Sequence, residues 1–217
     1  MKQQQTGFTL IELAIVLVII GLLLGGVLKG QELINSAKVK NMASDFKNIQ
    51  VYIYGYQDKY RALPGDDTNV ASHLSGSGTV PTAGTGGTLG NGVIQGAWDA
   101  VGTEESAVFW QHVRLAGLAP GSTVVGSAEY FPRNADGGRI GIQSVSGFTK
   151  ITGMNGAFVI CSNAILGKFA KQLDTSLDDG ETSTGSFRAV LAATTTGAGV
   201  TSTAVVDADS YTGCLAF

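Results

Sequence analysis

The stretch Gly7-Phe8-Thr9-Leu10-Ile11-Glu12 is followed by sixteen residues, Leu13 to Leu28, that contain no charged side chain. A helix rises about 1.5 Å per residue, so residues 8–28 would measure roughly 31 Å as a helix. That length matches the hydrocarbon thickness of a bilayer. The stretch therefore predicts a membrane helix that carries one carboxylate, Glu12. A charge at bilayer depth costs roughly 2.5–3.5 kcal/mol on insertion scales, so we expect Glu12 to have a partner.

The residues after this stretch do not resemble the end of a cleaved secretory signal. They read Lys29-Gly30-Gln31-Glu32, without the small-x-small site that a signal peptidase needs. We therefore expect the hydrophobic segment to remain in the mature protein. The rest of the chain is long enough for one modest domain.

Apolar side chains continue beyond the membrane segment at steps of three and four residues. They are Val39, Met42, Phe46, Ile49, Ile53, Tyr56 and Tyr60. This spacing is typical of one face of a helix, and no proline occurs before Pro64. The pattern predicts a single N-terminal helix over residues 8–60, whose second half is covered by a head domain formed by residues 61–217.

The head domain shows turn signals between short apolar runs. A low-complexity surface loop is expected over residues 75–92, and a short helix capped by Thr103 should run to about Ala116. Strands are expected at 128–131, 139–145, 147–152, 157–161, 186–192 and 200–207, and a second short helix at 163–173. The succession of hairpins favours an antiparallel sheet. The predicted fold class is α+β, with the long helix packed on that sheet.

Charge and motif content narrow the classes of function. From Arg61 onward the chain has eight Lys or Arg against thirteen Asp or Glu, a net charge of −5, so no attraction to nucleic acid is expected. The chain lacks a GxSxG motif, and the spacing of His73 and His112 suggests no Ser, His and Asp triad. We therefore predict no catalytic residues.

Two cysteines, Cys161 and Cys214, are too far apart for a CxxC redox pair or a cysteine-rich zinc site. A single disulfide is the simplest use, and it would place the head in an oxidising, extracytoplasmic compartment. Closing a loop of about fifty residues would stabilise the head by roughly 4 kcal/mol in the chain-entropy model. The alternative is a pair of unrelated buried thiols.

The N-terminus resembles the type IV prepilin and pseudopilin class, whose processing motif is a glycine, a methylatable residue and then TLIE. Gly7, Phe8 and the run from Thr9 to Glu12 fit this motif residue by residue. The resemblance implies that prepilin peptidase removes the leader, residues 1–7, by cleaving after Gly7, and methylates the new amine of Phe8. It also implies that Glu12 accepts the amine of a neighbouring subunit during assembly.

The resemblance further implies a structural protein rather than an enzyme. Such a pilin is stored in the inner membrane with its head extracytoplasmic. An inner-membrane assembly platform then builds it, with identical or related subunits, into an extracellular or periplasmic filament. A pseudopilin of a type II secretion system is the nearest alternative. A membrane-tethered binding protein or enzyme that uses the same signal is the other. A cysteine pair that reaches nearly to the C-terminus is similar to the disulfide-bounded region of type IV pilins.

Four acidic residues, Asp174, Asp178, Asp179 and Glu181, gather around Gly180. Clustered carboxylates suit calcium, which takes six to eight oxygen ligands. The spacing is not that of an EF-hand, and a solvated acidic turn explains the same residues. We therefore expect either no cofactor or a calcium ion bound by these residues.

Overall fold

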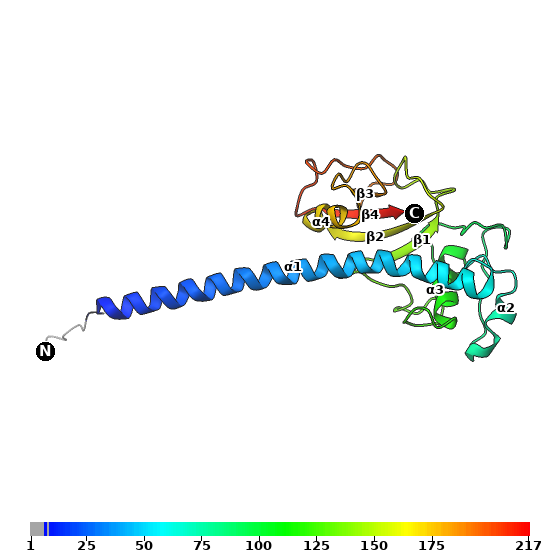
Figure 1. Ribbon diagram of the computed structural model, residues 1–217, viewed down its shortest axis with the longest axis horizontal. Coiled ribbons are helices and arrows are strands. Elements are labelled where there is room, and N and C mark those ends of the chain that lie inside the picture. Colours follow the sequence, from blue (N-terminus) through cyan, green and yellow to red (C-terminus); the bar gives the residue numbers. More distant parts are fainter. Residues whose placement is uncertain (1–6, 8) are drawn as a thin grey trace. The chain divides into compact units, whose positions relative to one another are not determined.

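The computed structural model describes residue 7 and residues 9–217 (Figure 1), so that most of the leader and Phe8 lie outside the described residues. The elements, in chain order, are α1 (Leu10–Tyr60), α2 (Val70–His73), the 3-10 helix η1 (Ser75–Ser77), α3 (Glu105–Leu115), β1 (Ile140–Ser144), β2 (Phe158–Leu166), α4 (Gly167–Leu177), β3 (Phe187–Leu191) and β4 (Ser210–Ala216).

The chain divides into two compact units, Met1–Lys38 and Val39–Phe217. In the first unit, α1 is long and apolar enough to cross a membrane, with a mean hydropathy of 2.8 over eighteen residues. None of the side chains in that window is buried within the protein. A helix that is apolar all round needs a hydrophobic environment from outside the chain.

The second unit begins at Val39, because the second half of α1 contributes its apolar face to the core of the head. All the apolar positions predicted from the helical spacing are buried, except that Tyr60 is half-buried. Ala43 joins the same face. The predicted amphipathic half of the helix is confirmed, and it ends at Tyr60 as expected.

The four strands form one antiparallel sheet in the order β1-β2-β4-β3. Ile142 pairs with Ile160 across β1 and β2, and Phe187 pairs with Leu215 across β3 and β4. The register of β2 on β4 shifts between Ser162 and Ile165. The α+β prediction, with a long helix and an antiparallel sheet, is confirmed.

The two faces of the sheet are covered differently. One face packs on α1, α3 and α4, and the rings of Phe46 in α1 and Phe187 in β3 meet edge to face with centroids 5.7 Å apart. Within the head, Figure 1 shows the second half of α1 running along this face of the sheet. The opposite face is covered by loops, where Trp98, Ile151 and Met154 pack on side chains of the strands.

Several local predictions were wrong. The N-cap of α3 is Glu104, without a side-chain cap bond, rather than Thr103. The second short helix begins at Gly167 instead of residue 163, because β2 continues as a paired strand to Leu166. Strand β4 was not predicted at all.

Three predicted strands, at 128–131, 147–152 and 200–207, are turns and loops, with a single bridge from Ile151 to Gly197. Each of these runs contains one side chain buried in the core, namely Tyr130, Ile151 and Val205. The apolar residues in these runs therefore reflect one buried side chain in each loop and not strand pairing in a sheet.

Candidate functional site

The helix α1 begins with a capping box formed by Thr9 and Glu12. Thr9 lies directly before the first helical residue, and its hydroxyl oxygen accepts a hydrogen bond from the Glu12 N–H at 3.3 Å. In return, Oε2 of Glu12 accepts hydrogen bonds from the backbone N–H and the hydroxyl of Thr9, both at 2.8 Å. This reciprocal pairing satisfies donors that the start of a helix leaves open. Within one chain, the Glu12 carboxylate is thus held by Thr9.

The expected cleavage position, Gly7, is exposed. Among the described residues, a Cβ placed on Gly7 would meet no atom within 4 Å. The expected methylation position, Phe8, lies outside the described residues.

Cys161 and Cys214 form the expected disulfide. The two residues are direct partners in the register of β2 and β4, the two central strands, and both are fully buried. The bond therefore joins the two central strands of the sheet across their shared ladder. It lies on the face covered by loops.

The acidic cluster comprises three of the four predicted residues. Carboxylate oxygens of Asp174, Asp178 and Asp179 lie within 4.8 Å of one another. Asp174 is fully buried, and neither of its oxygens accepts a hydrogen bond of normal geometry. Burial, followed by the nearby charges of Asp179, Asp178 and Glu181, raises the pKa of Asp174 to about 7, although the Gly180 N–H opposes the shift.

Glu181 does not belong to this group of ligand atoms. Its Oε1 accepts hydrogen bonds from the Ser202 N–H at 2.7 Å and from Ser183, and its Oε2 accepts one from the Ser202 hydroxyl at 3.0 Å. The Ser202 N–H, as the largest cause, lowers the pKa of Glu181. Glu181 therefore ties together two loop segments, and we assign it no place among the ligands.

Both histidines hold loops against the helices. Nδ1 of His112 accepts a hydrogen bond from the Gly65 N–H at 2.9 Å, so Nε2 carries the proton and donates to the carbonyl oxygen of Thr82 at 2.8 Å. Burial lowers the pKa of His112, which keeps the ring neutral. His112 is thus fully engaged in packing two loop segments on α3.

His73 belongs to a polar cluster that sequence reasoning missed. The buried carboxylate oxygen Oδ2 of Asp67 accepts a hydrogen bond from the Tyr56 hydroxyl at 2.8 Å and lies 2.7 Å from Nδ1 of His73. These residues join α1 to the segment after it, and the ring of His73 stacks on Tyr60. Their separation in sequence offered no motif by which to find them.

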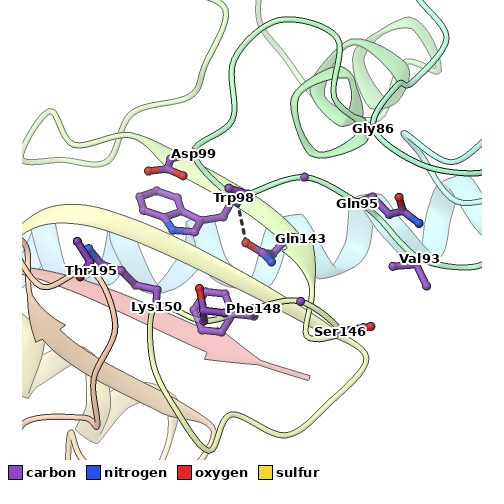
Figure 2. Close-up of a pocket in the computed structure, with 14 residues that line it drawn as sticks. Gly86, Val93, Gln95, Trp98, Asp99, Gln143, Ser146, Phe148, Lys150 and Thr195 are labelled. Carbon is purple, nitrogen blue, oxygen red and sulfur yellow. Dashed lines mark hydrogen bonds between the residues drawn. The ribbon is translucent and has the colours of Figure 1, made fainter.

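A pocket of about 690 Å³ opens on the face of the sheet covered by loops. Figure 2 shows the rings of Trp98 and Phe148 beside it. The backbone N–H of Trp98 donates a hydrogen bond to Oε1 of Gln143 at 2.8 Å. Asp99 and Lys150 are the charged residues in its lining. Neither histidine and no pair of carboxylates lines this pocket, so its lining provides neither a histidine base nor a carboxylate dyad.

Comparison with known proteins bears on the N-terminal segment. Residues 2–28 match the family model described as the prokaryotic N-terminal methylation motif. This match includes the capping box and the apolar part of α1 that follows it. No curated protein and no solved structure matches the chain. The chain therefore carries the prepilin-type N-terminal signal that type IV pilins and pseudopilins share.

Proposed function

We propose that this protein is a structural subunit, a pilin, of a type IV pilus or pilus-like filament. Proteins with a prepilin-type signal are generally structural, pilin-like subunits that prepilin peptidase processes. The observation that carries the proposal is the methylation motif at the start of a helix apolar enough to cross a membrane. The leader is cleaved after Gly7, Phe8 is methylated, and α1 anchors the chain in the inner membrane before assembly.

The position of Glu12 supports a role in assembly. In the unprocessed chain its carboxylate is held by Thr9. Cleavage after Gly7 creates a positively charged amine on Phe8. In an apolar filament core, the amine of one subunit and Glu12 of its neighbour compensate each other only when the two subunits are in register. A buried ion pair of this kind adds little net stability and instead specifies the arrangement.

Two further observations support the proposal. Gly7 is exposed at the position where the motif places the cleavage site, so an external peptidase could reach it. The head contains a disulfide, which suits a location outside the cytoplasm. The platform that assembles the filament and the neighbouring subunits are the partners that this function needs.

The decisive experiment compares Glu12→Val and Glu12→Gln with the wild type in the native host. Cleavage is followed by the size shift on immunoblots, methylation of Phe8 by mass spectrometry, and assembly by the yield of sheared filaments and electron microscopy. We expect normal cleavage but strongly reduced filaments, because the amine of the neighbour loses its acceptor. Glu32→Gln is the matched control, since Glu32 lies on the same helix, is exposed and pairs with Lys29 at 2.7 Å.

Wild-type amounts of sheared filament from Glu12→Val would refute the assembly role. An assay of secreted proteins, added to the same comparison, separates the two filament classes. Filaments on the cell surface identify a pilus, whereas a block in protein secretion without surface filaments identifies a secretion pseudopilin.

A further inference from the structure

We propose that Asp174, Asp178 and Asp179 bind one calcium ion at the C-terminal end of α4. This site goes beyond the proposed role in filaments, because it concerns the head and does not involve the N-terminal motif.

The helix brings the first two ligands together. Asp174 and Asp178 are four residues apart, which places them on the same side of a helix, and Asp178 is the C-cap of α4. Asp179 follows in the loop. Oxygens on opposite sides of a calcium ion, each 2.3–2.6 Å from it, are at most about 5 Å apart, whereas around magnesium the limit is about 4.2 Å. One oxygen of each residue lies within 4.8 Å of the others, which is compatible with a shared calcium ion.

The buried Asp174 is the observation that points to a ligand. Its side chain is fully buried, it faces the other two carboxylates, and neither of its oxygens accepts a hydrogen bond of normal geometry. Burying a carboxylate in this state is costly unless an opposite charge or a metal compensates it. In a solvated acidic turn Asp174 would be exposed, whereas in this structure it is buried.

The electrostatic surroundings of the three carboxylates also favour a bound cation. The three acids lie at the negative end of the α4 dipole, where anions are unfavourable and cations are stabilised. Among the described residues, no salt bridge links a lysine or arginine to any of them, and Lys171 of the same helix pairs with Asp207 at 2.6 Å instead. A divalent cation would supply the missing positive charge.

The loop already holds the two other ligands in place. Oδ2 of Asp178 accepts hydrogen bonds from the N–H groups of Ser186 and Phe187, which leaves Oδ1 for a metal. Asp179 accepts one bond on each oxygen, from the Glu181 N–H at 2.9 Å and the Thr184 hydroxyl at 3.0 Å. Each of these oxygens keeps a further lone pair, so both residues can ligate a cation without losing their present partners.

Calcium at this position would join α4 to the edge strand β3. Asp178 holds the first residue of β3, and the ring of that residue, Phe187, packs on Phe46 of α1. Binding therefore stabilises the helix end, the loop and the sheet edge together. At a calcium concentration one hundred times the Kd, we expect the Tm to rise by roughly 5–10 °C.

The test uses the full-length protein in detergent, stripped with EDTA. Thermal unfolding is followed by tryptophan fluorescence during titration with calcium, magnesium or an equivalent ionic strength of potassium chloride. Calcium stoichiometry is measured by equilibrium dialysis. We expect one calcium per chain and a Tm increase that calcium produces at a much lower concentration than magnesium.

Two variants make the test specific. Asp174→Asn should lose the calcium response and, because it removes a buried unpaired charge, should be at least as stable as the wild type in EDTA. Glu181→Gln is the matched control and should keep the full response to calcium. The proposal is wrong if the wild type shows no calcium-dependent shift, if potassium chloride gives the same shift, or if Asp174→Asn responds like the wild type. An equal response to magnesium would overturn the assignment to calcium.

Discussion

Replacing Phe46 by alanine tests whether the second half of α1 is a structural part of the head. The side chain of Phe46 is only 1% exposed and packs edge to face on Phe187. Removing a buried Phe ring costs about 3–5 kcal/mol, and the lost ring pair belongs to that cost. Alanine recovers up to about 0.7 kcal/mol through its higher helix propensity. We therefore expect the free energy of unfolding to fall by about 3–4 kcal/mol.

Most domains have only about 5–15 kcal/mol of stability, so Phe46→Ala should remain folded with a Tm lowered by roughly 6–16 °C. Val51→Ala provides a control on the same helix, because Val51 is 64% exposed. A surface change of this kind should alter stability by no more than about 0.5 kcal/mol.

Urea unfolding of the purified protein in detergent measures both variants. Trp98 and Trp110 are buried in the head and report its unfolding by fluorescence. A loss smaller than about 1 kcal/mol for Phe46→Ala, the size of an average substitution, would refute the reasoning. The helix would then not be held by the sheet in the manner described.

Three further predictions concern the stability of the head. Replacing Cys161 and Cys214 together by serine should lower the free energy of unfolding by up to about 4 kcal/mol, and dithiothreitol should then have no additional effect on urea unfolding. Burial lowers the pKa of His112. The stability that the neutral ring contributes to the head is therefore present above the unfolded pKa of about 6.5 and is lost as the pH falls, by at most about 1.4 kcal/mol per pH unit. His112→Asn should reduce this slope in urea unfolding measured between pH 5 and 8, and an unchanged slope would contradict the assignment. Burial raises the pKa of Asp45 to about 6, so its contribution is present below the unfolded pKa of about 4 and is lost as the pH rises to about 6. Asp45→Asn should therefore stabilise the head at pH 7 by about 1 kcal/mol after allowance for partial exposure, whereas destabilisation would show that burial does not disfavour this charge.

The features that sequence reasoning found are those encoded by neighbouring residues. The helical face from Val39 to Tyr56 follows from the 3.6-residue period, which leaves its mark within any short window. The capping box and the methylation motif lie within a few consecutive residues for the same reason. The strand segments of β1 and β2 were predicted from their local composition, but their direct pairing was not, because a strand was wrongly expected between them at 147–152.

The acidic site was found only in part. Sequence proximity grouped Asp174, Asp178, Asp179 and Glu181, but hydrogen bonds to Ser202 and Ser183 turn the last of these away. The burial of Asp174 depends on how α4 packs on the sheet. No local pattern distinguishes a buried aspartate from a solvated one.

The sequence by itself determined the membrane-length helix, its covered face, the processing signal and the α+β class, because each depends on local period or on adjacent residues. Only the tertiary structure decided the position of β4 between β2 and β3, the cross-strand place of the disulfide and the Tyr56, Asp67 and His73 cluster. These features join residues that are distant along the chain. Their pairing is set by which surfaces the whole head can bury at once, and that is a property of the packed domain rather than of any single segment.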